Sequence, residues 1–185
     1  MKTQQIKDLM VPISEYVTIH KDAFMAEAIQ ALESEVKRYQ EGPYRHSSLV
    51  VTDDQNHVVG RLSQVDIMRA MEPRYCKLGD AHWLGRSVLS KEVLITLRES
   101  FELWEQPLDR MCQELSKAKV KDYMQQPSEG MFVSENDTIN IACHRIVMGR
   151  HHSLLVTHGK KIIGILRSTD LFNNIYDIMS TRDCL

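Results

Sequence analysis

The sequence lacks the features that mark several large classes of protein. It has no apolar run near the roughly 18 residues that a membrane span requires. Its N-terminus, MKTQQIKDLMVPI, has no charged segment followed by an apolar stretch, as a signal peptide would. Its 23 basic and 25 acidic side chains leave no excess charge to attract nucleic acid or an anionic membrane. We therefore expect a soluble cytoplasmic protein without membrane contact, and the charge balance disfavours nucleic acid as a partner.

Cysteine pairs, metal-ligand spacings and catalytic motifs are also missing. The four cysteines are scattered without a C-x-x-C pair, which favours reduced structural thiols over a disulfide frame or a zinc site. No group of histidines has a clear ligand spacing, so we predict no metal site. The sequence contains no G-x-S-x-G, G-x-x-x-x-G-K or H-E-x-x-H motif. These absences indicate a protein that is not an enzyme.

What the sequence does contain is a repeat. IKDLM at 6–10 returns as VKDYM at 120–124, RHSSLVV at 45–51 as RHHSLLV at 150–156, and VVGRLSQVDIM at 58–68 as IIGILRSTDLF at 162–172. Asp8 and Asp122 are offset by 122 − 8 = 114 residues, and Asp66 and Asp170 by 170 − 66 = 104, because repeat 1 is longer after its first helix. Two similar units in tandem tend to pack as a pseudo-twofold body, and a cleft on the axis can bind a ligand.

Each repeat is predicted to run strand, helix, strand, strand, helix. In repeat 1 the expected strands are 16–19, 49–51 and 58–62, and the expected helices carry apolar residues at helical spacing: Met25, Ile29, Leu32 and Val36, then Ile67 and Met71. In repeat 2 the strands are 131–133, 154–156 and 162–166, and the helices carry Ile139, Cys143 and Ile146, then Phe172, Ile175 and Met179. We predict an α+β fold of two β-α-β-β-α repeats, 1–71 and 120–185, separated by a mainly helical insert, 72–119.

The insert combines an irregular start with a helical pattern. Residues 75–85 have the character of a loop, and apolar residues then follow at spacings of three and four: Leu94, Leu97, Phe101, Trp104, Leu108, Met111 and Leu115. Pro107 falls inside this pattern and predicts a kink, or two helices with Pro107 in the first turn of the second. The apolar seam either packs on the chain's own repeats, which is slightly favoured, or contacts a second subunit or a partner.

The end of the strand pair carries one candidate half-site in each repeat. Gly60-Arg61-Leu62-Ser63-Gln64-Val65-Asp66 is matched by Gly164-Ile165-Leu166-Arg167-Ser168-Thr169-Asp170. A glycine lets backbone approach a ligand, the following helix offers free N–H groups, and a carboxylate in its first turn can accept hydrogen bonds from ribose hydroxyls. Ser63 with Asp66 also approximates a capping box, so helix capping is the simpler alternative.

An arginine and a histidine precede the hairpin in both repeats. Arg45-His46 and Arg150-His151 each stand just before a strand, where cationic donors suit phosphate. A solvated loop with ordinary charges is the alternative, and retention of the pair in both repeats favours phosphate.

These motifs resemble a tandem pair of CBS domains, called a Bateman module, over 6–71 and 120–179. The family pattern ends its strand pair in Gly-apolar-apolar-Ser/Thr-x-x-Asp. Repeat 1 follows it with Gly60, Ser63 and Asp66, with Arg61 as the one non-apolar exception. Repeat 2 keeps Gly164 and Asp170 but has Arg167 in place of the hydroxyl residue, which removes the hydroxyl contact or adds a cation for phosphate.

The resemblance implies a regulatory module that binds AMP, ADP, ATP or S-adenosylmethionine in clefts between the repeats, forms a homodimer and uses no catalytic cofactor. It assigns ribose to Asp66 and Asp170, phosphate to Arg45, His46, Arg150 and His151, and the base to Val17, Thr18, Phe132 and Val133. Gly60, Ser63, Gly164, Arg167 and Thr169 complete the expected contacts. Because no enzyme or channel domain is evident in the sequence, we expect the output to reach a partner protein in trans.

The alternative function is a ligand-free dimerisation or interaction scaffold that acts through the helical insert. The unequal motifs further predict that the aspartate of repeat 1 contributes more to binding than that of repeat 2.

Overall fold

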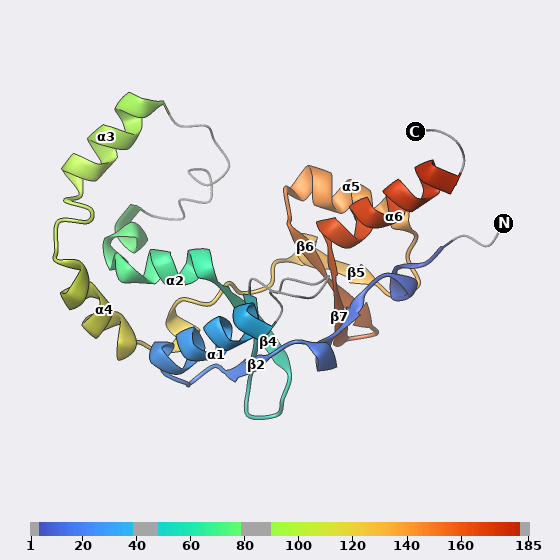
Figure 1. The fold of residues 1–185 in the computed structure, drawn as a ribbon, viewed down its shortest axis with the longest axis horizontal. Helices are drawn as coiled ribbons and strands as arrows, with labels where there is room; N and C mark the ends of the chain where they lie inside the picture. Colours follow the sequence, from blue (N-terminus) through green and yellow to red (C-terminus); the bar gives the residue numbers. More distant parts are fainter. Residues whose placement is uncertain (1–3, 39–47, 79–89, 182–185) are drawn as a thin grey trace. The chain divides into compact units, whose positions relative to one another are not determined.

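The computed structural model describes residues 4–38, 48–78 and 90–181, and its elements are drawn in Figure 1. The chain divides into two compact units. One comprises Met1–Thr18, Thr52–Gly60 and Gln126–Leu185, and the other comprises Ile19–Val51 and Arg61–Gln125. The units thus follow the sequence repeats only in part, because the N-terminal segment and Thr52–Gly60 of the first repeat group with the second repeat.

The second repeat forms a four-stranded sheet covered by two helices. Its elements are η5 (Glu129–Met131), β5 (Phe132–Ser134), α5 (Ile139–Gly149), β6 (Ser153–His158), β7 (Lys161–Arg167) and α6 (Ser168–Thr181). The strand order is β1-β7-β6-β5, where β1 (Val11–Pro12) comes from the N-terminal segment, β5 is parallel to β6 and β7 is antiparallel to it. Alternate apolar side chains of β6 and β7, including Leu154, Val156 and Leu166, are buried with Ala142 of α5 and Leu171 of α6. Both predicted helices and all three predicted strands are confirmed to within a few residues.

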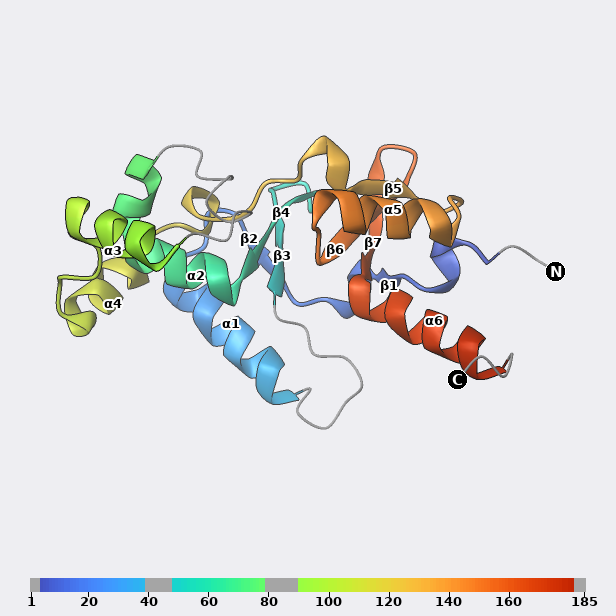
Figure 2. The same ribbon diagram turned by 90° about the horizontal axis from the view of Figure 1, so that it is seen from above.

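The first repeat has the same elements in the same order. They are β2 (Thr18–His20), α1 (Met25–Arg38), β3 (Ser48–Thr52), β4 (Val58–Ser63) and α2 (Gln64–Met71), with strand order β2-β3-β4. Met25 and Leu32 of the predicted apolar face of α1 are buried together with Ala28, whereas Ile29 is 37% exposed and is not part of the core. Figures 1 and 2 both show α1 and α2 side by side. The predicted α+β class and doubled strand-helix order are therefore confirmed.

The segment that opens each repeat packs on the other repeat's elements. The first such segment contains η1 (Ile6–Asp8), β1 (Val11–Pro12) and η2 (Ile13–Glu15), and Val11 of β1 pairs with Ile165 of β7. The second contains η4 (Val120–Asp122), and Gln125 beyond it pairs with Arg61. The two pairs are equivalent, because 125 − 11 = 114 and 165 − 61 = 104 are the offsets of the sequence repeat.

A second pair of bridges obeys the same offset. Gln5 bridges Thr138 just before α5, and Lys119 bridges Phe24 just before α1. Here 119 − 5 = 114 and 138 − 24 = 114, so the duplication extends to individual backbone contacts. Because the opening segment of repeat 1 pairs with β7 and Thr138 of repeat 2, the first residues of the chain cluster with the second repeat.

The described part of the insert contains two α-helices, α3 (Lys91–Ser100) and α4 (Leu108–Ser116), after the short η3 (Pro73–Leu78). Pro107 is the N-cap of α4, so the prediction of two helices is confirmed and the proline stands one position before the first turn. Met111 and Leu115 of α4 are buried against α1 and α2. No residue of α3 is buried, and Figure 1 shows α3 standing away from α2 and α4. Of the predicted apolar seam, only Met111 and Leu115 are therefore core, and Leu108 of the same helix is 60% exposed. Most of the predicted irregular segment, 79–85, lies outside the described residues.

Glu72, the C-cap of α2 and first residue of the insert, anchors the connection between α3 and α4. Its carboxylate accepts hydrogen bonds from Arg74 Nε and Nη2, at 2.7 and 2.8 Å, and from the backbone N–H of Trp104 at 2.8 Å. The side chain of Glu72 is 1% exposed. Glu102 and Trp104 both have positive φ, at 50° and 63°. The backbone is therefore left-handed at Trp104, whose N–H group binds the Glu72 carboxylate. The Arg74 guanidinium lowers the pKa of Glu72.

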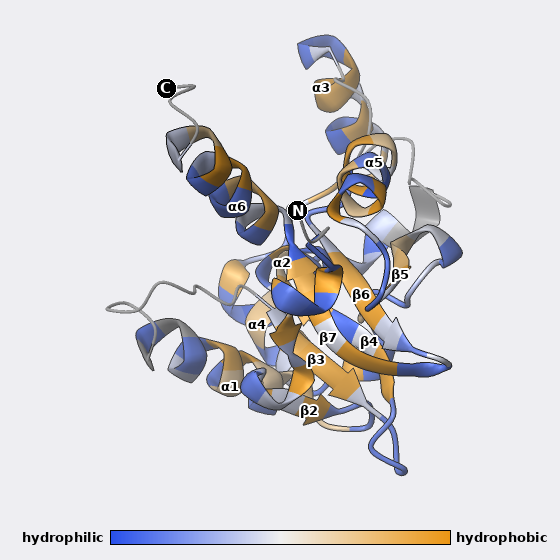
Figure 3. Ribbon diagram, turned by 90° about the vertical axis from the view of Figure 1, so that its right-hand side faces the viewer, coloured by the Kyte–Doolittle hydropathy of each residue, from blue (hydrophilic) through white to orange (hydrophobic). Residues whose placement is uncertain are grey.

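Helix α6 leaves apolar side chains on its outer face. Figure 3 shows it with hydrophobic and hydrophilic stripes, and the exposed apolar residues are Phe172, Ile175, Tyr176, Ile178 and Met179. The predicted apolar face of this helix is therefore exposed rather than part of the core. Within the described part of the chain, no helix is both long and apolar enough for a transmembrane span.

Candidate functional site

The half-site of repeat 1 is a helix N-terminus closed by its own side chains. Ser63 ends β4 and caps α2, and its hydroxyl accepts a hydrogen bond from the Asp66 N–H. Asp66 Oδ2 in turn accepts from the Ser63 N–H at 2.9 Å and from the Ser63 hydroxyl at 2.6 Å. The capping interpretation is thus confirmed, since the two residues satisfy each other's donors. Asp66 is nevertheless a carboxylate only 7% exposed, in the first turn of a helix.

One oxygen of Asp66 remains available. Oδ2 carries both hydrogen bonds from Ser63, whereas among the described residues Oδ1 has only an ion pair, with Arg69 Nη1 at 3.8 Å. The Arg69 side chain is exposed. A sugar hydroxyl therefore has an acceptor here that no strong donor of the described chain occupies.

The half-site of repeat 2 holds its carboxylate differently. Asp170 lies in the first turn of α6, and its Oδ2 accepts from the backbone N–H of Arg167 at 3.0 Å. The Arg167 guanidinium adds Nε to Oδ2 at 2.9 Å and Nη2 to Oδ1. The sequence placed Arg167 and Asp170 together in one half-site, and the structure joins them as a two-pronged ion pair.

The glycine of repeat 2 is required by the chain's own backbone. A Cβ on Gly164 would lie 2.9 Å from the Val11 carbonyl oxygen and 2.6 Å from Met10 Sδ. Because Pro12 of β1 pairs with Gly164, the missing side chain lets β1 join the sheet. Gly60, the counterpart in repeat 1, is buried in β4.

The residues expected to line the base pocket flank the first strand of each repeat. Val17 is half-buried just before β2, and Thr18 is exposed as its first residue. Phe132 is half-buried at the start of β5, while the side chain of Val133 belongs to the hydrophobic core. A ligand can therefore meet Val133 only through its backbone.

Arg145 is a residue that the sequence motifs did not single out. It is half-buried in α5, and its Nη1 donates a hydrogen bond to the Phe132 carbonyl oxygen. The carbonyl of one residue that was expected to line the base pocket is thus already engaged. Alignment of the two repeats could have drawn attention to Arg145, because it corresponds to Ala31 in repeat 1 (145 − 31 = 114).

The second Arg-His pair ends a helix. Arg150 is the C-cap of α5 in the left-handed conformation, with φ 49° and ψ 39°, and the His151 N–H donates to the Ile146 carbonyl at 3.0 Å. A Cβ on Gly149 would lie 2.3 Å from the His151 ring, so that ring lies against the helix end. Thr169 is exposed in the first turn of α6. Arg45 and His46 lie outside the described residues.

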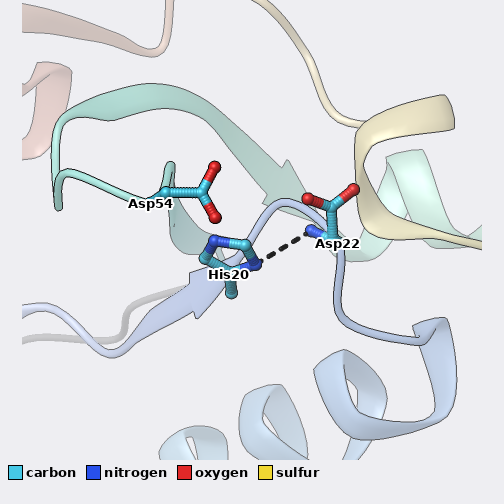
Figure 4. A group of neighbouring side chains, drawn as sticks. All are labelled: His20, Asp22 and Asp54. Atoms are coloured by element: carbon cyan, nitrogen blue, oxygen red, sulfur yellow. Dashed lines mark hydrogen bonds between the residues drawn. The ribbon is translucent and has the colours of Figure 1, made fainter.

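His20 ends the first strand of repeat 1, β2, Asp22 follows that strand, and both are drawn with Asp54 in Figure 4. His20 Nδ1 accepts a hydrogen bond from the Asp22 N–H at 3.3 Å. Lys121 Nζ donates to Asp22 Oδ1 at 2.7 Å and lowers the pKa of that carboxyl. Asp54 belongs to the β3–β4 turn in the other compact unit, so within one unit a metal would find two ligands, one fewer than a catalytic zinc site takes.

The doubled order of elements, with a carboxylate in the first turn of each closing helix, agrees with sequence comparison. The family model of the CBS domain matches residues 6–73 and 120–177, which is more than half of the chain. The chain belongs to the CBS domain family. No curated protein matches it. The resemblance in the sequence and its two copies are thereby confirmed.

Solved structures with similar folds are also CBS domain proteins. A CBS domain-containing protein of unknown function from Bacillus anthracis superposes with a TM-score of 0.62 at 15% identity, covering 94% of each chain. CBSX2 in complex with AMP gives 0.59 at 17% identity, covering 94% of this chain and 97% of that one. A CBS domain-containing protein of unknown function from Kribbella flavida gives 0.57 at 17%, covering 94% and 98%. At these identities the likeness establishes the CBS fold.

Proposed function

We propose that this CBS pair is a regulatory module that binds an adenine nucleotide and signals to a partner protein. The observation that carries the proposal is the buried carboxylate at the N-terminus of the closing helix in both repeats, Asp66 and Asp170. Buried carboxylates are uncommon unless hydrogen-bonded, and acidic residues beside a strand-to-helix turn bind ribose hydroxyls at other nucleotide sites. Tandem CBS domains are regulatory ligand-binding modules, and a similar fold has been solved with AMP.

The remaining expected contacts extend this proposal. Ribose is assigned to the carboxylates, the base to the backbone around Thr18 and Phe132, and phosphate to the Arg-His pairs. The N–H groups at the start of the closing helix add a positive dipole end that favours an anionic ligand. The candidates are AMP, ADP, ATP and S-adenosylmethionine, which share the adenosine moiety and differ in charge.

Isothermal titration calorimetry of the full chain with each of the four compounds tests the proposal. We expect saturable binding of at least one compound, weakened at least about tenfold by Asp66→Ala, which removes an acceptor for the sugar hydroxyls. Asn173→Ala, at an exposed position of α6, is the matched control. The absence of binding of all four compounds at millimolar concentration would refute the nucleotide function.

The proposed signalling requires a surface that a second protein can contact. The exposed apolar residues of α6 support a homodimer, since contiguous exposed apolar area is typical of interfaces between subunits. Phe172 and Tyr176, 67% and 56% exposed, are one turn apart on this helix. Sedimentation equilibrium should give a dimer for the native chain and a monomer for Phe172→Glu/Tyr176→Glu. Asn173→Glu adds charge to the same helix and should stay dimeric; an unchanged mass for the double variant contradicts this interface.

A second candidate function is an interaction scaffold that acts through α3. The supporting observation is that α3 has no buried residue and exposes Val93, Leu94 and Ile95. Under this alternative, Leu94→Ser abolishes capture of the physiological partner while nucleotide binding persists. Loss of both properties together would instead mean that α3 contributes to the fold.

A further inference from the structure

The carboxylate of repeat 2 is already occupied by a side chain of its own repeat. Both oxygens of Asp170 accept hydrogen bonds from the Arg167 guanidinium, and Oδ2 also accepts the Arg167 N–H. The two side chains are largely buried, with exposed fractions of 15% for Arg167 and 8% for Asp170. A two-pronged arginine–carboxylate pair combines charge with fixed geometry, which makes it stronger than hydrogen bonds between neutral groups.

The same position in repeat 1 is occupied by a residue that cannot form this pair. Arg167 corresponds to Ser63 (167 − 63 = 104), whose short side chain engages Asp66 Oδ2 only. Asp66 Oδ1 keeps just the 3.8 Å ion pair with exposed Arg69 among the described residues. A neutral sugar hydroxyl can therefore reach the carboxylate of repeat 1 without displacing a two-pronged cation.

A second arginine points to the same asymmetry. Arg145 Nη1 donates to the carbonyl of Phe132, one of the residues expected to line the base pocket. Its counterpart in repeat 1 is Ala31, which has no donor side chain. The alignment of these positions is secure, because α1 and α5 begin at equivalent residues, Met25 and Ile139, and bury equivalent alanines, Ala28 and Ala142. In repeat 2, arginines thus engage two acceptors. Repeat 1 has neither arginine.

We propose that Arg167 and Arg145 close the repeat 2 half-site to the sugar and the base, so that the chain binds one adenine nucleotide, through the Asp66 half-site. The inference rests on the proposed function and adds which copy of the half-site operates. Ribose hydroxyls are neutral donors, and they do not outcompete a guanidinium that already makes two charge-assisted bonds. A nucleotide must displace Arg167 before it can bind Asp170. This requirement weakens its binding there by about ten- to a hundredfold relative to binding at an open carboxylate.

Equilibrium dialysis of the full chain with AMP, which counts bound ligand directly, tests the proposal. The native chain should bind one AMP, and Arg167→Ser, which installs the repeat 1 residue, should bind two. Arg145→Ala added to Arg167→Ser should tighten the second site further. Asp170→Asn in the Arg167→Ser chain should remove the second site, and Asp66→Asn in that chain should remove the first.

The reciprocal change keeps the test decisive if Arg167→Ser does not fold. Ser63→Arg places the guanidinium beside Asp66 and should weaken AMP binding by the native site at least about tenfold. Circular dichroism of each variant checks its fold.

The outcomes separate the two proposals. Two equivalent sites in the native chain, one site in a folded Arg167→Ser chain, or undiminished affinity in a folded Ser63→Arg chain would each overturn the closure of repeat 2 and leave the nucleotide function standing. Binding of none of AMP, ADP, ATP and S-adenosylmethionine by either the native chain or Arg167→Ser, at millimolar ligand, overturns both.

Discussion

Replacing Glu72 by glutamine tests how the connection between α3 and α4 is held at the end of α2. The substitution keeps the size of the side chain and removes its charge. The native carboxylate is 1% exposed and accepts from the Arg74 guanidinium, the Arg74 N–H at 3.2 Å and the Trp104 N–H at 2.8 Å. A glutamine oxygen can serve some of these donors, but its NH2 group must face at least one of them. We therefore expect one lost hydrogen bond and a weakened ion pair.

The expected loss of unfolding free energy is about 2–3 kcal/mol. A hydrogen bond to a charged group contributes roughly 1.5–3 kcal/mol. Breaking a fully buried pair costs about 3–5 kcal/mol, but Arg74 is 23% exposed and regains hydration, so the lower range applies. Urea denaturation followed by Trp104 fluorescence, in a Trp83→Phe chain with one tryptophan left, measures the loss. Because Trp104 donates to Glu72, the probe reports this attachment.

The pH dependence provides a second measurement. Arg74 lowers the pKa of Glu72, so the native state holds fewer protons than the unfolded state, in which a glutamate titrates at about 4.3. The contribution of Glu72 to stability is therefore complete above about pH 4.3 and is lost as pH falls through the lowered pKa. The Glu72→Gln chain should lack this part of the acid destabilisation.

A matched control is Asp109→Asn, which neutralises an exposed carboxylate in the first turn of α4. It should change the free energy of unfolding by less than about 0.5–1 kcal/mol. If Glu72→Gln is as mild as this control and its acid dependence equals that of the native chain, Glu72 does not anchor the connection between α3 and α4.

Three further predictions test other parts of the structure. Gly164→Ala should destabilise the chain by about 1–3 kcal/mol in urea denaturation, because its Cβ would crowd the β1 backbone; native stability would mean that β1 does not require the glycine. Met111→Ala should cost about 2–4 kcal/mol as a buried residue, whereas Leu94→Ser on exposed α3 should cost less than about 1, and equal costs would contradict the division of the insert. Asp66→Ala should lower AMP affinity more than Asp170→Ala in calorimetry; equal losses would contradict the asymmetry.

The repeated elements could be predicted because their patterns are local. Apolar residues three and four apart produced α1 and α5 at the expected positions, and the polar turn 53–56 joined two apolar runs into the β3–β4 hairpin. Pro107 was expected to divide the insert, since it lacks an amide donor, and it stands at the start of α4. A helix or turn depends mainly on residues within a few positions, so one sequence suffices to find it.

The candidate site could be predicted only in part. The duplicated spacing identified Asp66 and Asp170, and the structure places each in the first turn of a closing helix. It did not identify Arg145, whose partner Phe132 is 13 residues away on another element. Nor did the glycine pattern reveal that Gly164 makes room for β1, a contact between residues more than 150 positions apart.

The amino-acid sequence by itself determined the family, the two copies of the strand-helix order and the positions of the paired aspartates, because duplication leaves a record in spacing. Only the tertiary structure decided that each opening segment packs on the other repeat, and that Glu72 holds the connection between α3 and α4 through Trp104. It also decided that Arg167 folds back onto Asp170 instead of reaching away from it. These outcomes depend on which donors and acceptors meet after the chain has closed on itself, and distance along the sequence does not determine those meetings.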